Sequence, residues 1–322
     1  MLQGRPLYDN AADAAFYVPP AQWATVQRAL DRQLNMLIVG ERGTGKTSLL
    51  RQLQRAQRER GRRAVYIDAA NPEDSIDLAQ RLQVALLGDD ERSGRSAPAG
   101  GWQSSGSQTF LETLSSLGKA EPAIALVDAS SAGLSVYNVF GRMRDTLWQL
   151  PHQWVVAIDA SDRATVLRPP ADAFFDRVVD LDHLSLDHLT ELLVRRVPEA
   201  PHSMLKQVAE LAQGNPRAAL RALADADVDG RDPTAGLIER GLLLERASAI
   251  GRPYAMVMAE LLDQGAASPS DLELQTSLGV SRARLTKLLR DLLDRDLVVA
   301  GVEKNEGVGR PRTIYRPNLT TA

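Results

Sequence analysis

The chain has 322 residues, a formal net charge of −3 and no cysteine. These values exclude disulfides and thiolate metal sites, and any attraction for nucleic acid must come from a local basic patch. Hydrophobic residues make up 44% of the chain and charged residues 25%, which is ordinary for a soluble globular protein of two or three domains. The sequence has no cysteine, no apolar run of membrane-spanning length and no signal-peptide core, so we expect a cytoplasmic protein without a membrane partner.

Short apolar runs of strand length alternate with helical stretches over the first 185 residues. The runs are 35–39, 64–68, 123–128, 154–159 and 177–181. Continuous apolar strands separated by helices are typical of a parallel sheet that helices cover on both faces. We therefore predict an α/β domain over residues 1–184. Within it, the Gly- and Ser-rich segment 88–108 is predicted to be a mobile surface loop.

A phosphate-binding loop motif, G-x-x-x-x-G-K-[ST], follows the first of these runs. Its strand and helix flanks are the context that the motif needs. The glycines let backbone N–H groups face phosphate oxygens, the lysine neutralises the β/γ-phosphates and the threonine hydroxyl ligates Mg²⁺. The motif predicts ATP or ADP with Mg²⁺ as cofactors. The predicted contact residues are Gly40, Glu41, Arg42, Gly43, Thr44, Gly45, Lys46, Thr47 and Ser48.

A P-loop site also needs an acidic residue at the end of a neighbouring strand to hold the Mg²⁺ shell. Asp128 closes the run 123–127, so we predict that it acts with Thr47 at the metal, with Asp159 as the competing residue. Ala129 follows Asp128 and cannot act as a general base, so we expect slow hydrolysis. The residues predicted to take part in this hydrolysis are Lys46 and Asp128. An acidic residue from elsewhere in the chain is the open alternative.

From Ser185 the pattern is helical only, and residues 185–250 are predicted to form an α-helical lid and a connecting helix. Asn215 is a good N-cap and Pro216 suits the first helical position, which places Arg217 in the first turn. A cation there opposes the helix dipole unless an anion approaches. We therefore predict that Arg217 contacts a nucleotide phosphate; the alternative is a solvated surface arginine.

Residues 251–322 follow the order helix, helix, turn, helix, strand, basic turn, strand, which predicts a winged helix-turn-helix domain. Ser281 caps the third helix, whose leucine stripe leaves a basic outer face suited to the major groove. A Gly- and Pro-rich turn presents further arginines, as suits a narrow minor groove. The predicted DNA-binding residues are Arg282, Arg284, Lys287, Arg290, Arg310 and Arg312. A protein-docking or dimerisation module is the alternative.

The order of these parts resembles AAA+ ATPases, and most closely the origin-recognition replication initiators and the STAND signalling ATPases. The resemblance covers roughly residues 15–316. Its motifs are Gly40–Thr47, the strand 123–128, the strand ending at 159–161, the segment 174–177, the box 214–217 and the winged helix. Hydrolytic members carry a glutamate where this chain has Ala129.

The resemblance implies several roles. Ser161 matches sensor 1 and Arg217 matches sensor 2. Arg177 matches the arginine that reaches a neighbour's nucleotide, with Arg163 and Arg168 as alternatives, and residues 17–19 fall where the family recognises adenine.

Together these features predict an ATP- and DNA-binding switch with slow hydrolysis, such as an initiator, a loader or a transposition-type regulator. Its predicted partners are double-stranded DNA, further copies of the chain in an ATP-dependent homo-oligomer, and other proteins. The alternatives are a STAND-like signalling or transcription regulator, or an ATP-driven motor or remodeller.

Overall fold

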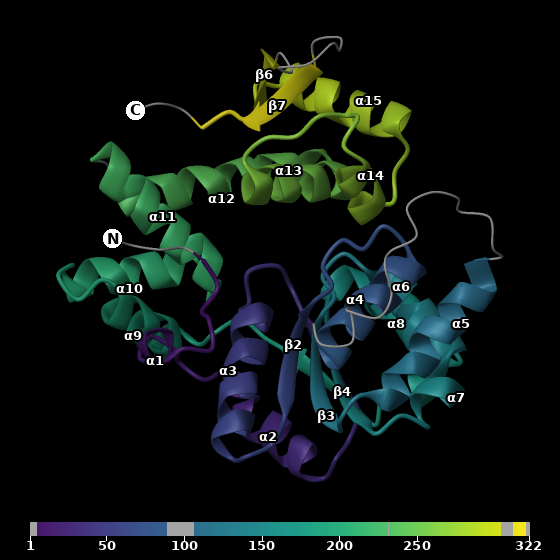
Figure 1. The fold of residues 1–322 in the computed structure, drawn as a ribbon. Coiled ribbons are helices and arrows are strands. Elements are labelled where there is room, and N and C mark those ends of the chain that lie inside the picture. The colour runs from purple at the N-terminus through teal and green to yellow at the C-terminus, as the bar shows by residue number, and fades with distance from the viewer. Residues whose placement is uncertain (1–4, 89–105, 231, 304–311, 320–322) are drawn as a thin grey trace. The chain divides into compact units, whose positions relative to one another are not determined.

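The computed structural model of the chain describes residues 5–88, 106–230, 232–303 and 312–319 (Figure 1). The chain forms two compact units, Met1–Leu220 and Arg221–Ala322. The three-part division at residues 184 and 250 stays a prediction.

A parallel sheet of five strands, in the order β2-β3-β4-β1-β5, forms the centre of the first unit. The strands are β1 (Met36–Gly40), β2 (Ala64–Asp68), β3 (Ala123–Asp128), β4 (His152–Asp159) and β5 (Arg177–Leu181). Their apolar runs are continuous because helices cover both faces of the sheet (Figure 1). The predicted α/β class and parallel sheet are confirmed. Because β4 lies between β1 and β3, the carboxyl ends of these three strands meet at one edge of the sheet.

The α-helices of the first unit precede, connect and follow the strands. They are α1 (Ala11–Ala14), α2 (Trp23–Asp31), α3 (Lys46–Glu59), α4 (Ser75–Leu87), α5 (Gly106–Ser116), α6 (Gly133–Val136), α7 (Arg144–Leu147), α8 (Arg163–Val166), α9 (Leu186–Arg196), α10 (His202–Leu211) and the start of α11 (Pro216–Asp229). The predicted loop 88–108 is wrong at its carboxyl end, because α5 begins at Gly106. The apolar face of α5, which buries Leu114, stabilises this earlier start. Residues 89–105 of that prediction lie outside the described residues.

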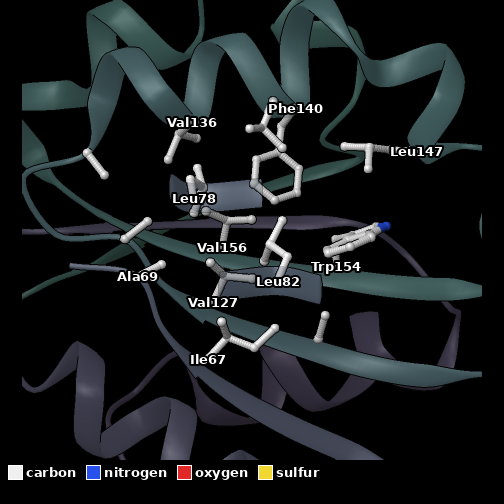
Figure 2. Packing of buried hydrophobic residues seen from close by; sticks show 14 of the residues in the cluster. Ile67, Ala69, Leu78, Leu82, Val127, Val136, Phe140, Leu147, Trp154 and Val156 are labelled. Carbon is white, nitrogen blue, oxygen red and sulfur yellow. The ribbon is translucent and has the colours of Figure 1, made fainter. Parts of the chain in front are cut away.

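Two hydrophobic cores lie on opposite faces of the sheet. One contains Leu30 of α2 and Leu50 of α3. The other lies under α4, α5 and the segment 133–147, and it contains the large side chains of Phe140 and Trp154 (Figure 2). Their ring centroids are 5.4 Å apart at an interplanar angle of 71°, an edge-to-face pair. Phe140 belongs to a π-helix, Tyr137–Arg142, between α6 and α7.

The second unit contains α12 (Pro233–Ile250), α13 (Arg252–Gln264), α14 (Leu272–Leu278), α15 (Arg282–Leu293) and an antiparallel pair, β6 (Val298–Glu303) and β7 (Arg312–Pro317). Leucines at helical spacing in α13 and α15 form its core with residues of both strands. These elements follow the predicted order, while residues 304–311, which contain the predicted Gly- and Pro-rich turn, lie outside the described part. A helix with the length and apolar character needed to span a bilayer is absent from the described residues.

Candidate functional site

The P-loop connects β1 to α3 at the carboxyl edge of the sheet. Gly43 and Gly45 adopt φ angles of +85° and +97°, which favour glycine. The loop closes on itself, because the Thr44 hydroxyl donates to the Glu41 carbonyl at 2.9 Å. α3 begins at Lys46, so its first N–H groups and the positive end of its dipole face the loop. The sequence motif therefore folds into the local geometry that binds phosphate.

The Lys46 side chain is buried and held by three oxygen atoms. Its Nζ donates to the carbonyls of Gly40 and Glu41 at 2.8 and 2.9 Å. The same nitrogen lies 2.9 Å from Oδ1 of Asp159, and the two side chains are only 5% and 6% exposed. Asp159 reaches this position because β4 pairs with β1 in a register that sets it beside Gly40. Asp159 therefore belongs to the lysine end of the site.

Asp128 lies at the other end of the site, beside Thr47. The Thr47 hydroxyl donates to Oδ2 of Asp128 at 2.5 Å, and Tyr66 donates to the same oxygen at 3.1 Å. Ser130 donates to Oδ1 at 3.3 Å. Burial, followed by the negative charge of Asp128, raises the pKa of Tyr66 above its ordinary value, so the phenol stays a neutral donor. A hydroxyl and a carboxylate brought together are hard oxygen ligands that suit Mg²⁺.

Ala129 leaves no proton acceptor next to Asp128 in the chain. Its methyl group is fully buried in the core under α4, and its N–H donates to the Ala157 carbonyl at 2.9 Å. The position is therefore fixed by the sheet and faces apolar neighbours.

The segment 214–217 lies directly on the P-loop, within the first unit. Asn215 caps α11, because its Oδ1 accepts from the N–H groups of Arg217 and Ala218 at 3.0 and 3.2 Å. Its Nδ2 donates to the Arg42 carbonyl at 3.1 Å. The approach is close: a Cβ on Gly43 would lie 2.4 Å from Oδ1 of Asn215 and 2.9 Å from Cβ of Arg217. The structure thus brings the predicted Arg217 to the loop, although its phosphate contact stays a prediction.

Other predicted site residues lie apart from this cluster. Ser161 is exposed in the turn after β4. The residue that contacts Lys46 is Asp159, at the end of β4. Arg177 begins β5 opposite Met36, at the amino end of β1. The length of the strand, at the usual rise per residue, separates it by about 13 Å from the P-loop edge. Arg177 therefore does not reach the P-loop of its own chain. Its role at a neighbour's nucleotide stays a prediction, as does the sensor role of Ser161.

The alternative arginines have partners within the first unit. Arg163 forms an ion pair with Asp180 of β5. The Arg168 guanidinium lies 4.5 Å from the ring centroid of Tyr137. Tyr17, in the predicted adenine-recognition segment, packs edge-on against Trp23 at 5.6 Å.

Four of the predicted DNA-binding side chains are exposed on one helix of the second unit. They are Arg282, Arg284, Lys287 and Arg290 of α15. Arg312 forms an ion pair with Asp271, and its Nε donates to Ser270 Oγ at 3.1 Å, which neutralises its charge locally. Arg310 lies outside the described residues.

Sequence reasoning missed how Asp159 and Tyr66 serve this site. The sequence predicts Asp159 only as a competing metal residue, whereas the structure places it on Lys46. The available signal was its position at the end of an apolar run. Tyr66 carried the weaker signal of a phenol two residues before a strand end.

A loop of this geometry between a buried strand and a helix, on a parallel sheet, defines a P-loop nucleotide-binding domain. A family model described as an AAA ATPase domain matches residues 20–205, which is more than half of the chain. The chain belongs to this AAA ATPase family, and the resemblance to AAA+ ATPases seen in the sequence is confirmed.

Many solved structures resemble this chain in fold, and these include the following three. The Orc1 protein of Aeropyrum pernix, solved in complex with DNA, is 17% identical, with a TM-score of 0.51 over 94% of this chain and 91% of that one. Cdc6p of Pyrobaculum aerophilum is 15% identical, with a TM-score of 0.51 over 95% and 93%. A Walker-type ATPase of Pyrococcus abyssi is 16% identical, with a TM-score of 0.52 over 99% and 97%. At these identities the likeness concerns the fold. A comparison with curated protein sequences gives no match.

Proposed function

We propose that the protein binds ATP with Mg²⁺ in the P-loop and that the bound nucleotide controls its contact with double-stranded DNA or with further copies of itself. The observation that carries the proposal is the convergence of Lys46, Thr47 and Asp128 at one edge of the sheet. Lys46 and the N–H groups at the start of α3 would hold the phosphates. Thr47 and Asp128 would hold Mg²⁺, which neutralises phosphate charge when bound.

Hydrolysis is expected to be slow. Steady-state turnover should lie below about 0.1 s⁻¹, roughly a hundredfold under the value of a median enzyme, because Ala129 supplies no general base beside Asp128. Release of phosphate from Mg²⁺–ATP, followed with a coupled assay, measures this rate. Turnover near 10 s⁻¹ that is lost in Asp128→Asn would contradict slow hydrolysis and favour the alternative of an ATP-driven motor.

The contact between the 214–217 segment and the P-loop gives the nucleotide a route to the rest of the chain. Asn215 touches the Arg42 backbone, and Arg217 follows it in the first turn of α11. A phosphate bound in the loop would meet this helix start and change how the segment packs. Supporting this proposal, the helix begins at the loop through a side-chain cap rather than through a flexible linker.

Gly214→Ala tests a different contact of the same segment, its packing against the backbone at Leu184. Gly214 has a φ of +78°, and an added Cβ would lie 2.2 Å from the Leu184 carbonyl oxygen. We expect a loss of about 2–3 kcal/mol in unfolding free energy from strain and collision, measured by denaturant unfolding. Gly61→Ala is the matched control, because it has a φ of +74° and open space around the added atom. An equal effect in both variants would show that the close packing at Gly214 contributes nothing.

DNA binding is proposed for the outer face of α15. Its exposed basic side chains lie opposite the leucines that α15 buries in the core of the second unit. An exposed basic helix of this kind suits the major groove. The Orc1 structure, which shares the fold, contains DNA. The second unit has the element order of a winged helix, and we propose that assignment for it.

Fluorescence anisotropy with a labelled duplex tests the whole proposal. Binding is measured with ATP, ADP or no nucleotide, at two salt concentrations, for the wild type, Lys46→Ala and Lys287→Ala. We expect the nucleotide to change the affinity of the wild type but not of Lys46→Ala. Lys287→Ala should lower the salt slope by about 0.9, whereas the exposed Lys206→Ala should not. Equal affinity in all nucleotide states would contradict the proposed control.

A further inference from the structure

The Lys46 ammonium is already neutralised before any phosphate arrives. It lies 2.9 Å from Oδ1 of Asp159, and both side chains are almost completely buried. A buried charge cannot lose its partner without a large loss of stability. A phosphate that recruits Lys46 must therefore compete with Asp159 for it.

The second oxygen of Asp159 has partners of its own. The Ser131 N–H donates to Oδ2 at 3.1 Å, and Ser131 Oγ lies 3.5 Å from the same oxygen. Nε of Arg42 lies 3.8 Å from Oδ2, and Nη2 of Arg42 donates to Ser131 Oγ at 3.0 Å. Oδ1 of Asp159 thus faces Lys46, and Oδ2 faces Ser131 and Arg42.

The backbone at Ser131 is shaped for this contact. Ser131 has a φ of +56°, which is uncommon for a residue other than glycine. That conformation directs its N–H at Asp159. Strained positions of this kind persist where the surrounding structure holds them, and they cluster at functional sites.

We propose that Asp159 sets the nucleotide affinity of this site by competing with phosphate for Lys46. When Mg²⁺–ATP binds, the ammonium passes from Oδ1 of Asp159 to the phosphates, while Arg42 and Ser131 keep the carboxylate in place through Oδ2. The Asp159 carboxylate then lies beside the triphosphate and opposes its binding. The inference rests on the proposed binding of ATP by the P-loop.

Two other roles for Asp159 predict different results. A carboxylate that helps to hold Mg²⁺ would favour nucleotide binding, and its loss would weaken affinity only when Mg²⁺ is present. A purely structural carboxylate would affect the stability of the fold and leave affinity unchanged. Neutral replacement of Asp159 distinguishes competition from both roles.

The test is calorimetric titration of the full chain with ATP, with Mg²⁺ and with chelator. The variants are Asp159→Asn, Asp159→Ala and Lys46→Ala. Asp182→Asn is the matched control, because it removes a carboxylate just beyond β5 that accepts from Gln22 at 2.9 Å. We expect Asp159→Asn to bind about tenfold more tightly in both conditions. Asp182→Asn should stay within about twofold of the wild type, and Lys46→Ala should bind at least about a hundredfold more weakly.

Asp159→Ala is the second variant for this test, in case the amide of Asp159→Asn disturbs folding. Circular dichroism measures the folding of each variant. If both Asp159 variants bind ATP as the wild type does or more weakly, the proposed competition is wrong. If Lys46→Ala still binds much more weakly in that case, the proposed nucleotide site stands. Binding by Lys46→Ala at the wild-type level overturns the proposed function itself.

Discussion

Lys46→Ala is expected to lower the affinity for Mg²⁺–ATP by at least about a hundredfold, or about 2.7 kcal/mol. Lys46 is the buried cation of the loop, and its ammonium would form charge-assisted hydrogen bonds to the β- and γ-phosphates. These bonds are strong because the surroundings are shielded from water. Isothermal titration calorimetry of the wild type and the variant measures the difference.

Lys119→Ala is the control for this prediction, because Lys119 is exposed just ahead of β3, near the opposite edge of the sheet. The control should bind as the wild type does. Lys46→Ala also leaves Asp159 without its nearest cation, so its folding must be checked by circular dichroism. A folded Lys46→Ala variant that binds Mg²⁺–ATP with wild-type affinity would contradict the assignment of the P-loop.

Phe140→Ala is expected to lower the unfolding free energy of the first unit by about 3–5 kcal/mol. The Phe140 side chain is fully buried and lies beside Trp154 (Figure 2). It also contacts Phe174 and Phe175. Its removal leaves a cavity that a close-packed sheet and helices can fill only in part. Urea unfolding followed by tryptophan fluorescence measures the change, because Trp154 lies 5.4 Å from the lost ring.

Leu134→Ala is the matched control, since Leu134 lies earlier on the same segment, in α6, and is 61% exposed. It should change the unfolding free energy by no more than about 0.5 kcal/mol. A loss below about 1 kcal/mol for Phe140→Ala would show that this aromatic cluster is not the packed core of the unit.

The sequence was sufficient for features that depend on local pattern. The strands were predicted because each is a continuous apolar run, as burial on both faces requires. The P-loop and the N-cap of α11 were predicted because a motif and a cap depend on a few neighbouring residues. The convergence of Thr47 and Asp128 followed from the rule that parallel strands share a carboxyl edge.

Features that depend on the order of strands could not be predicted. The contact between Lys46 and Asp159 exists because β4 lies directly beside β1, and that order is not written in any local pattern. The packing of Asn215 on the P-loop joins residues far apart in the chain. The same holds in the second unit, where a bridge between Ala267 and Tyr315 brings Arg312 to Asp271.

The π-helix at 137–142 was also beyond the sequence pattern. A single wide turn leaves the apolar spacing of a helix almost unchanged, so periodicity does not reveal it. Its position is fixed by tertiary packing, because an added Cβ on Gly141 would lie 2.6 Å from the Cβ of Ala171. Close contact between these two segments therefore selects the backbone that holds Phe140 over Trp154.

The most direct measurement is a calorimetric titration of the wild-type chain with ATP in the presence of Mg²⁺. We expect saturable binding of one nucleotide per chain that weakens when Mg²⁺ is removed, because Thr47 and Asp128 would hold the ion against the phosphates. The absence of saturable heat for a folded chain, with and without Mg²⁺, would contradict nucleotide binding by this loop.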